Sequence, residues 1–478
     1  MQPSHFTNDI LRQSGIAFGT SGARGRVEQF TDQVCAAFTV AFLTTMHRSF
    51  AFERVAIGLD RRPSSPAMAA ACTSAARALG LGVDDYGVLP TPALALQAMK
   101  EGVPCIMITG SHIPFDRNGI KFYRPDGEIT KQDETTILNA KLALPASLTP
   151  EREPTSDAAN EAYADRYTRW FVEKPLTGWR VGLYQHSAAG RDLSAYIIDA
   201  LGADVVVLGR RDEFVPVDTE AVSKEDQARG RAWTEQHSLN AIFTTDGDGD
   251  RPLLGDETGT WLRGDIVGLL CAKALGIEAL AVPVSCNTTI ESCGAFKKVV
   301  RTRIGSPFVL EATASLADSY SSVAGFEANG GFMLQTPLEH EGRRLTALPT
   351  RDALLPALTL MVQAARKGQP LSALNKALPE RYTASDRLQD FPTEKSRALI
   401  EQWSANPEQL LRDLMMTQTV KAADTTDGFR VTLANEEIVH LRPSGNAPEL
   451  RCYAEADSME RANTLVRKTL EKLAALAG

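Results

Sequence analysis

The feature that most constrains this chain is a series of short apolar runs rich in β-branched residues, separated by stretches with helical character. These runs lie at residues 55–59, 105–108, 181–184, 205–208, 241–244 and 280–284. Runs of this length that are apolar on both faces are typical of buried strands covered by helices. The pattern therefore predicts α/β layering over roughly the first three quarters of the chain.

The length of 478 residues is too great for one hydrophobic core, and usual domain sizes predict roughly three or four domains. Turn-rich stretches at 145–154, just after Arg251 and at 367–370 are candidate boundaries. The implied domains are residues 1–150, 151–252, 253–368 and 369–478. A cleft between domains is then available for a ligand.

The last segment differs from the others. Residues 428–433 and 437–441 flank a polar turn and are typical of a hairpin, and a further strand at 450–456 leads into a helix. We therefore expect an α+β domain at this end of the chain.

The composition excludes several classes of protein. A formal net charge of -8 argues against a nucleic-acid binder, which usually has a basic face. The seven cysteines are scattered and include no C-x-x-C pair, which disfavours a disulfide framework and a zinc site. We expect buried thiols in a reducing cytoplasm. The first 15 residues lack an apolar signal region, so neither secretion nor membrane insertion is expected.

The polar stretch 109–121 places one hydroxyl on an irregular segment between two apolar runs. Ser111 is that hydroxyl, and Pro114, Asn118 and Gly119 keep the segment irregular. A serine that carries a phosphoryl group needs an exposed hydroxyl, cations and a nearby acid/base group. Taken alone, the stretch is better explained as an ordinary polar loop after a strand. Only the other polar loops favour a nucleophile.

Asp246, Asp248 and Asp250 alternate with glycines directly after the apolar run 241–244. If the backbone stays extended, the three carboxylates point in one direction, which suits a hard cation such as Mg²⁺. An EF-hand is excluded because its sixth position is Arg251 rather than glycine and a strand precedes the loop. A solvated acidic turn is the alternative, although clustered carboxylates are costly without a cation.

Two further loops carry groups suited to phosphates and sugars. The groups that form a cradle for a dianionic phosphate are Arg442, Ser444, Gly445, Asn446 and Arg451. A tight turn with solvated arginines explains that segment equally well. The loop 325–331 offers Glu327 and Asn329 between glycines, which suits hydrogen bonding to sugar hydroxyls, although an ordinary turn is the simpler explanation. Arg24 lies in a glycine-rich turn, either as a phosphate contact or on a mobile arm.

Taken together, these loops resemble those of the α-D-phosphohexomutase superfamily, most closely its bacterial phosphomannomutase branch. The segments that carry the resemblance are 18–24, 109–112, 118–121, 246–251, 325–331 and 442–445. Their order and spacing match as well as their content, over nearly the whole chain. The resemblance implies three similar mixed-sheet α/β domains and a smaller C-terminal α+β domain around a central cleft.

The resemblance also implies roles for the site residues. Ser111 would be the phosphoserine, and Asp246, Asp248 and Asp250 would hold Mg²⁺ together with a phosphoserine oxygen. The transfer site would be surrounded by Arg24, Lys121 and Arg251, with Lys121 as the first acid/base candidate and His112 as the second. The sugar would be bound by Glu327 and Asn329, and the phosphate that does not react by Arg442, Ser444, Gly445, Asn446 and Arg451.

The implied activity is a cytoplasmic isomerase that interconverts mannose 6-phosphate and mannose 1-phosphate through a hexose 1,6-bisphosphate intermediate. Phosphoglucomutase or dual activity is the alternative within the class. A phosphoserine-dependent sugar phosphatase and a non-catalytic sugar-phosphate-binding protein are alternatives outside it. The sequence does not fix the oligomeric state.

The chain also departs from the usual patterns of these relatives. Gly110 and Ile113 stand where many relatives have alanine and asparagine. Asn329 and Gly331 stand where common sugar loops have serine and histidine, and Asn446 stands where threonine is usual. The departures at the sugar loop bear on substrate choice.

Overall fold

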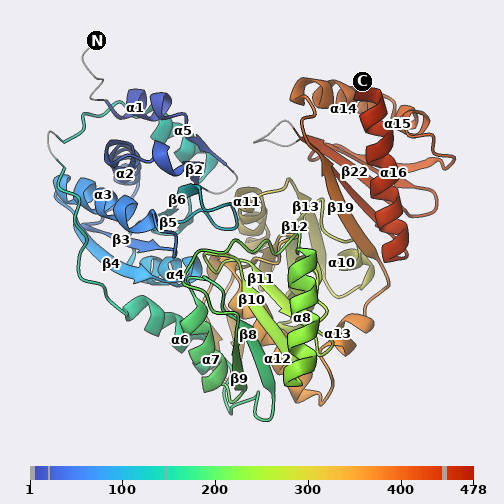
Figure 1. The fold of residues 1–478 in the computed structure, drawn as a ribbon, viewed down its shortest axis with the longest axis horizontal. Coiled ribbons are helices and arrows are strands. Elements are labelled where there is room, and N and C mark those ends of the chain that lie inside the picture. The colour runs from blue at the N-terminus through green and yellow to red at the C-terminus, as the bar shows by residue number, and fades with distance from the viewer. Residues whose placement is uncertain (1–5, 20–21, 146–147, 444–448, 478) are drawn as a thin grey trace.

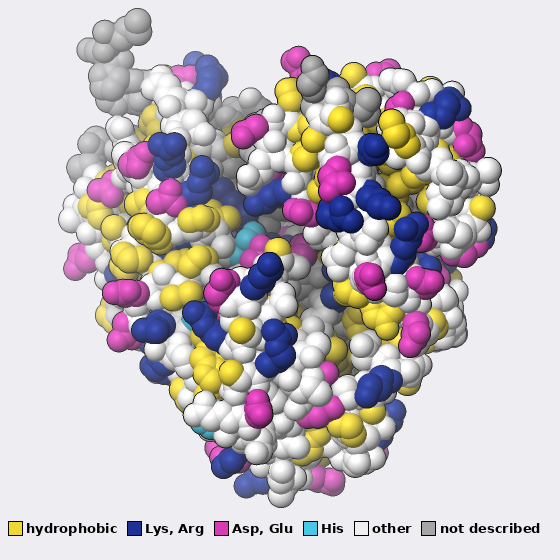
Figure 2. Space-filling view, turned by 45° about the vertical axis from the view of Figure 1, so that its right-hand side comes forward, with side chains coloured by type: hydrophobic (Ala, Val, Ile, Leu, Met, Phe, Trp, Pro, Cys, Tyr) yellow, Lys and Arg dark blue, Asp and Glu magenta, His cyan; other side chains and the backbone are white. Residues whose placement is uncertain are grey.

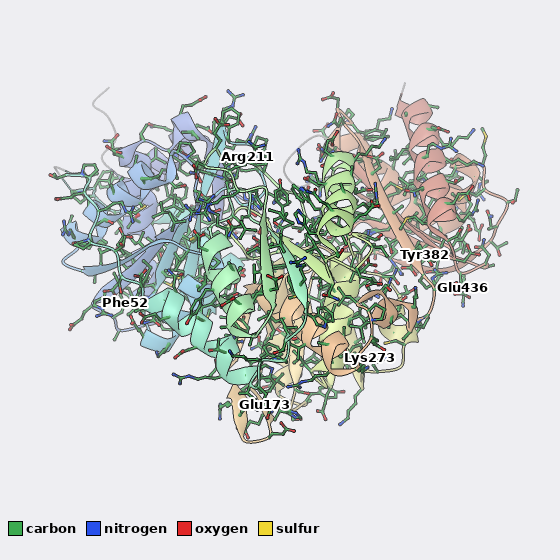
Figure 3. All side chains as sticks on the ribbon, turned by 60° about the horizontal axis from the view of Figure 1, so that its bottom comes forward. Phe52, Glu173, Arg211, Lys273, Tyr382 and Glu436 are labelled. Carbon is green, nitrogen blue, oxygen red and sulfur yellow. The ribbon has the colours of Figure 1, made fainter. Side chains whose placement is uncertain are left out.

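The computed structural model describes residues 6–19, 22–145, 148–443 and 449–477. The chain forms four successive units, each built on its own sheet. Figure 1 shows the first unit, in blue, and the fourth, in red, on opposite sides, with the second and third between and below them. Figure 3 labels Phe52 in the first unit and Tyr382 at the start of the fourth sheet, likewise on opposite sides.

The first unit holds a 7-stranded mixed sheet in the order β1-β2-β6-β5-β3-β4, with β7 paired to β6. Its strands are β1 Ala17–Phe18, β2 Ala23–Arg26, β3 Arg54–Leu59, β4 Gly82–Val88, β5 Cys105–Ile108, β6 Arg117–Arg124 and β7 Gly127–Glu128. Its helices are α1 Thr7–Ser14, α2 Asp32–Met46, α3 Ser65–Ala78, α4 Thr91–Glu101 and α5 Lys131–Asn139. The strands predicted at 55–59 and 105–108 are confirmed as β3 and β5, which lie side by side and parallel inside the sheet.

The second unit holds a 4-stranded sheet in the order β11-β10-β8-β9. Its elements are α6 Ala158–Trp170, β8 Arg180–Tyr184, α7 Arg191–Ala200, β9 Asp204–Leu208, α8 Lys224–His237, β10 Ala241–Thr245 and β11 Pro252–Gly255. Because β11 pairs with β10, this sheet continues past residue 252, where the sequence suggested a boundary. The expectation that 205–208 is buried on both faces is wrong, since β9 is an edge strand and Val207 is 51% exposed.

The third unit holds a 5-stranded mixed sheet in the order β13-β12-β14-β15-β18, with a separate β16-β17 hairpin. Its strands are β12 Ala279–Pro283, β13 Lys298–Thr302, β14 Val323–Phe326, β15 Phe332–Leu334, β16 Leu338–His340, β17 Arg343–Leu345 and β18 Leu348–Asp352. Its helices are α9 Gly264–Ala274, α10 Thr289–Ser292, α11 Ser306–Ala317, α12 Leu354–Arg366 and α13 Ser372–Lys376.

The fourth unit holds an antiparallel sheet in the order β19-β23-β22-β21-β20. Its elements are β19 Tyr382–Leu388, α14 Thr393–Ala405, α15 Pro407–Asp413, β20 Val420–Asp424, β21 Phe429–Leu433, β22 Ile438–Pro443, β23 Leu450–Ala456 and α16 Met459–Ala477. The predicted hairpin is confirmed as β21 and β22. Three mixed α/β sheets followed by an α+β unit confirm the predicted fold class.

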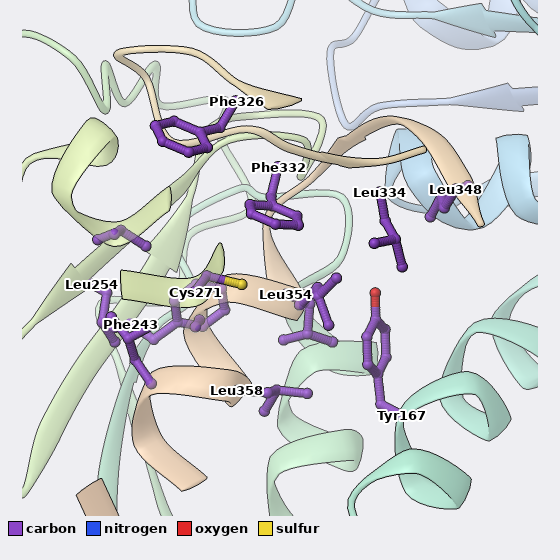
Figure 4. Packing of buried hydrophobic residues seen from close by; sticks show 14 of the residues in the cluster. Tyr167, Phe243, Leu254, Cys271, Phe326, Phe332, Leu334, Leu348, Leu354 and Leu358 are labelled. Atoms are coloured by element: carbon purple, nitrogen blue, oxygen red, sulfur yellow. The ribbon is translucent and has the colours of Figure 1, made fainter. Parts of the chain in front are cut away.

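The first three units share one continuous core, whereas the fourth has its own. Figure 4 shows part of the shared core, where Tyr167 of α6, Phe243 of β10 and Leu358 of α12 lie in one cluster. The fourth unit meets the third through polar contacts. Thr288 donates its backbone N–H to Glu455 at 3.0 Å, and Ile304 donates its backbone N–H to Asp427 at 2.9 Å. Apolar packing thus joins the first three units more closely than it joins the fourth.

Among the described residues, no helix combines the length and the apolar character needed to cross a membrane. All seven cysteines are free, and each is buried except Cys293, which is half-buried.

Candidate active site

The predicted site residues come from the ends of strands in different units. Ser111 follows β5, Asp246 follows β10, and Glu327 follows β14. In α/β sheets with parallel strands, ligands bind beyond the carboxyl ends of the strands. Figure 2 shows a hollow near the centre of the molecule, with acidic side chains and a histidine beside it and Lys and Arg side chains around it.

Ser111 lies in a loop whose backbone is held by the buried guanidinium of Arg62. Arg62 donates hydrogen bonds to the carbonyl oxygens of Ser111 at 3.0 Å, Pro114 at 2.7 Å and Arg117 at 2.9 Å. The Ser111 backbone has a φ of 55°, a left-handed conformation that costs a non-glycine residue about 1–2 kcal/mol. The loop therefore fixes the serine in a strained conformation, as functional sites often do.

Gly110 lies directly against this guanidinium. A Cβ atom at residue 110 would be 2.5 Å from Arg62 Cζ, so the glycine leaves room for the side chain that organises the loop. This contact gives a physical reason for the glycine where many relatives have alanine.

The Ser111 hydroxyl faces the aspartate cluster. Ser111 Oγ donates a hydrogen bond of 2.6 Å to Asp246 Oδ2, across 135 residues of sequence. His112 Nδ1 lies 3.3 Å from Ser111 Oγ. The structure therefore brings the predicted nucleophile, the first predicted metal ligand and one acid/base candidate together.

Asp246, Asp248 and Asp250 are fully buried, and one oxygen of each lies within 4.8 Å of the others. Asp248 Oδ1 and Asp250 Oδ1 are buried without a hydrogen-bond partner among the described residues. Buried polar atoms are nearly always paired, so two unpaired carboxylate oxygens in one cluster call for a ligand. Hard oxygen donors in this arrangement fit Mg²⁺.

The charges of the three aspartates are not equivalent. Burial, followed by repulsion from Asp248 and Asp250, raises the pKa of Asp246 well above its usual value. Burial opposes the charge of Asp250 too, but Arg351, Lys121 and Arg251 outweigh it and lower the pKa of Asp250. The cationic side chains thus hold the negative charge at one end of the cluster.

Lys121 lies inside this cluster. Its Nζ atom donates hydrogen bonds of 2.6 Å to Asp248 Oδ2 and to Asp250 Oδ2. The side chain is 4% exposed, so both contacts are shielded from water. Lys121 is therefore positioned beside the predicted metal ligands, in β6.

His112 is a neutral imidazole at physiological pH. Burial, followed by the charge of Arg251, lowers the pKa of His112 to about 3. Arg251 NH1 donates to His112 Nδ1 at 2.8 Å, which makes Nδ1 the acceptor nitrogen. Arg251 Nε also lies 3.6 Å from Asp250 Oδ1, so Arg251 connects the histidine with the aspartate cluster.

Arg24 contributes a further cation beside the nucleophile loop. In the register of β2 and β6, Arg24 lies opposite Gly119. Burial, followed by repulsion from Arg251, lowers the pKa of Arg24 to about 10, so the side chain stays charged at neutral pH. Its NH2 atom is buried and has no hydrogen-bond partner among the described residues, which suits an anion such as a phosphoryl group.

The predicted sugar loop is connected to the aspartate cluster by Arg351, which was not predicted from the sequence. Arg351 NH1 donates to Glu327 Oε2 at 3.2 Å, and Arg351 Nε donates to Asp250 Oδ2 at 3.0 Å. Asn329 Oδ1 accepts from the Gly331 N–H at 3.0 Å. A Cβ at Gly331 would lie 2.6 Å from Arg351 Cγ and Cδ, so the glycine admits the arginine.

The predicted phosphate loop is described only at its two ends. Ser444, Gly445 and Asn446 lie outside the described residues. Arg442 Nε lies 2.8 Å from Asp427 Oδ2, and the strand register places Arg442 opposite Arg451. These ends lie on the fourth unit, whereas the other site residues belong to the first three.

The register across β19 and β23 also places Arg387 opposite Arg451. Arg387, Arg451 and Arg442 therefore form a row across three strands. Arg387 was not predicted, because nothing in the sequence around it suggests a loop.

Thr91 and Arg62 also contribute to the site, and both were missed in the sequence. Thr91 donates to Asp248 Oδ2 at 2.6 Å from the start of α4. Arg62 follows the predicted strand 55–59, as the other polar loops follow theirs. Phe214, which packs 3.9 Å from the Arg62 guanidinium carbon, lies in a connection that carries no such signal.

Comparison with known proteins places this site in context. Residues 15–144 match the description "Phosphoglucomutase/phosphomannomutase, alpha/beta/alpha domain I", residues 263–382 match domain III, and residues 375–472 match the C-terminal domain. A phosphomannomutase of Salmonella muenchen is 52% identical over 100% of both chains. A phosphomannomutase of Sinorhizobium fredii is 41% identical, over 96% of this chain and 99% of the relative.

Solved structures share the fold. A putative phosphomannomutase from Thermus thermophilus superposes with a TM-score of 0.75 at 23% identity, over 96% of this chain and 98% of the other. At this identity the likeness concerns the fold alone.

Proposed function

Because this chain belongs to the phosphoglucomutase/phosphomannomutase family, we propose that it interconverts mannose 6-phosphate and mannose 1-phosphate. It is a phosphohexomutase, and the full-length relatives at 52% and 41% identity are both named phosphomannomutase. The manno substrate is therefore the first choice over the gluco substrate.

The observation that carries the mechanism is the Ser111 hydroxyl, 2.6 Å from Asp246 in a cluster with two further aspartates. A phosphoryl group on Ser111 Oγ would lie beside these carboxylates and the cations Arg24 and Lys121. Phosphoryl transfer depends mainly on positioning and on electrostatic stabilisation, and these are the properties that the cluster supplies.

Asp246, Asp248 and Asp250, with a phosphoserine oxygen, would hold Mg²⁺. When bound, the ion offsets negative charge on the phosphoryl group in transfer. Lys121 and Arg251 keep the carboxylates in place through the contacts described above. Arg24 is free to meet an equatorial phosphoryl oxygen with its unpaired NH2 atom.

In the first half of the reaction, the bond between phosphorus and Ser111 Oγ breaks while a bond forms from the free sugar hydroxyl to phosphorus. The hydroxyl proton passes to a base, and Ser111 Oγ gains a proton. In this structure the Ser111 hydroxyl uses its proton to donate a hydrogen bond to Asp246. Lys121 is our first choice of acid/base, and the neutral His112 is the second. After the 1,6-bisphosphate turns over, the second half returns its other phosphoryl group to Ser111.

Because the bisphosphate must turn over inside the site, the residues that bind its sugar and its distal phosphate must accept it in two orientations. Glu327 and Asn329 would bind the sugar hydroxyls, and Glu327 is held by Arg351 at 3.2 Å. Arg442, Ser444, Gly445, Asn446 and Arg451 would bind the phosphate that does not react, whichever carbon bears it. Arg442 and Arg451 lie on the fourth unit, whereas Ser111 lies on the first.

The test compares kcat/KM for mannose 1-phosphate and glucose 1-phosphate, with Mg²⁺ and a catalytic amount of hexose 1,6-bisphosphate. We expect mannose 1-phosphate to be preferred. A preference for glucose 1-phosphate above about tenfold, or roughly 1.4 kcal/mol, would overturn the substrate assignment. Inorganic phosphate is measured in parallel, since stoichiometric release would indicate a phosphatase.

A further inference from the structure

A second cationic pocket lies away from the site described above, where α4, α6 and the segment after β17 meet. The cavity has a volume of about 460 Å³. Its charged lining consists of Lys100, Arg166, Arg169, Arg344 and Asp165. Pockets of this volume lie in the range that binds small molecules.

Arg166 is the unusual member of this lining. It is only 9% exposed, and its NH1 atom donates hydrogen bonds of 2.8 Å to the Thr346 backbone oxygen and to Thr346 Oγ1. Its Nε and NH2 atoms are buried and have no hydrogen-bond partner among the described residues. A buried guanidinium with two unpaired nitrogens is costly, so these nitrogens call for an acceptor such as a ligand oxygen.

The other charges leave the pocket positive. Asp165 pairs with Arg169 at 2.5 Å, and Glu339 pairs with Arg344 at 3.3 Å. Lys100 is exposed and forms no ion pair with a described residue. After these pairings, Lys100 and Arg166 remain without a carboxylate, so a dianionic group would balance the pocket.

The uncharged lining is largely apolar, with Leu96 and Met99 from α4 and Ala162 from α6. A bare inorganic ion would leave this surface uncovered. A ligand with a phosphate at one end and an apolar or planar part at the other would cover both surfaces.

We propose that this pocket binds a small molecule of that class, a phosphate-bearing metabolite with an apolar or planar moiety, separately from the sugar phosphate in the cleft. The phosphate meets Arg166 and Lys100, and the other moiety lies against Leu96 and Met99. The bound anion supplies the acceptors that Arg166 lacks.

The pocket lies at the far end of α4 from the phosphoryl-transfer site. Thr91, the first residue of this helix, contacts Asp248, whereas Lys100 lies near its last residue. A rise of 1.5 Å per residue separates the two by roughly 14 Å. The two sites are therefore distinct, and a variant in the pocket leaves every residue of the transfer site unchanged.

The experiment is a calorimetric titration with inorganic pyrophosphate as the anionic probe. Wild-type protein is expected to bind the probe in the cleft and at one further site in the pocket. Arg166→Met replaces the buried cation with an apolar side chain of similar length, and it is expected to show one site fewer than wild type. Its mutase kcat/KM is expected to stay within about twofold of wild type, which reports that the protein is folded.

A second variant guards against misfolding of the first. In Lys100→Gln the substitution is at an exposed side chain, and it is expected to weaken the pocket site about two- to fivefold, as for a partly solvated ion contact. Arg12→Gln, at a side chain that is 75% exposed on α1, is the matched control and should bind as wild type does. Equal stoichiometry and affinity in wild type, Arg166→Met and Lys100→Gln would overturn the proposal.

Discussion

Arg351 donates a hydrogen bond of 3.0 Å to Asp250, and this contact joins β18 of the third unit to the aspartate cluster of the second. The same guanidinium reaches Glu327 at 3.2 Å. One buried side chain therefore connects the proposed metal site with the proposed sugar site. Both carboxylates are almost completely shielded from water, and Arg351 supplies counter-charge to each of them, together with Lys121 and Arg251 at Asp250.

Removal of this charge should affect both stability and catalysis. Arg351→Met leaves two buried carboxylates with less compensation, so the free energy of unfolding should fall by about 3–5 kcal/mol. kcat/KM should fall by about 10- to 100-fold, as when groups that orient metal ligands are lost. Urea denaturation and steady-state kinetics measure the two effects. Arg351→Lys keeps the positive charge but not the guanidinium group that contacts both carboxylates. Its free energy of unfolding and its kcat/KM should lie between those of wild type and Arg351→Met.

Arg467→Met is the control for this prediction, since Arg467 is 62% exposed on α16 and should change stability by less than about 0.5 kcal/mol. If Arg351→Met were as stable and as active as this control, the connecting role of Arg351 would be disproved.

Arg351 also marks the limit of what the sequence predicts. Ser111 and Asp246 were found because each follows a short apolar run, where a sheet exposes its strand ends, and Glu327 was found because it lies in a polar loop between glycines. Arg351 lies inside the strand Leu348–Asp352, with no glycine or turn beside it. Its partner Asp250 is 101 residues away, and local pattern carries no record of such a contact.

The fold could likewise be predicted only in part from the sequence. Runs at 55–59 and 105–108 read correctly as interior strands because both of their faces are apolar and buried. The run 205–208 is equally apolar yet forms an edge strand, since pairing partners depend on the order of strands in the sheet. Strand order is a long-range property, and the period of apolar residues does not encode it.

Ser111→Ala should abolish phosphoryl transfer. Without the hydroxyl no phosphoserine forms, and kcat should fall at least about a thousandfold, as for other lost nucleophiles. Incubation with labelled hexose 1,6-bisphosphate should phosphorylate wild type and leave the variant unlabelled. Ser404→Ala is a suitable control, because that hydroxyl is exposed and bonds only to its own helix at Ile400. Label retained by Ser111→Ala would assign the phosphoryl group to another residue.

Removal of metal should stop activity without unfolding the protein. The buried aspartates Asp246, Asp248 and Asp250 are already close to the cationic side chains of Lys121, Arg251 and Arg351. These cations offset much of the repulsion that a bound ion would otherwise relieve. Treatment with a chelator should abolish turnover while the Tm falls by less than about 5 °C, and Mg²⁺ should restore turnover. Unfolding on chelation would show that the cations do not suffice.

Acid should weaken the fourth unit through His440. This side chain is 1% exposed, and Nε2 lies 2.6 Å from the Asp427 carbonyl oxygen. Burial lowers the pKa of His440 from 6.5 to about 4, although the hydrogen bond to Asp427 opposes the shift. Between these two pH values the unfolded chain binds a proton that the folded chain does not. The free energy of unfolding therefore falls as pH drops through this window, and the contribution is fully present above it.

The loss from His440 should total about 3 kcal/mol. His440→Gln can still donate to the same carbonyl but cannot be protonated, so its stability should depend less on pH than that of wild type. Chemical denaturation at pH values between 4 and 7 measures the difference. His340→Gln, at a side chain that is 59% exposed, should follow wild type. Identical pH profiles for wild type and His440→Gln would refute the assignment.

The row of Arg387, Arg451 and Arg442 should behave as a site that is incomplete without an anion. Like charges directly opposite each other destabilise a sheet by a few tenths of a kcal/mol to about 1 kcal/mol. Arg387 and Arg451 share one carboxylate, that of Glu449, at 3.6 Å and 3.8 Å, which leaves the two arginines with a net positive charge. Arg387→Gln should therefore raise the Tm slightly when no phosphate is present. Because Arg442 is predicted, together with Arg451, to bind the phosphate, Arg442→Gln should raise KM for mannose 1-phosphate by about tenfold or more, as for a lost charged hydrogen bond. Arg387→Gln, at a side chain that is 47% exposed, should raise KM only about two- to fivefold.

Thermal melts with and without phosphate, together with KM values, separate the two effects, and Arg467→Gln controls for loss of a surface charge. If the row serves only solubility, all three variants will have the same Tm and the same KM. A phosphate site requires KM to be highest in Arg442→Gln, lower in Arg387→Gln and lowest in Arg467→Gln.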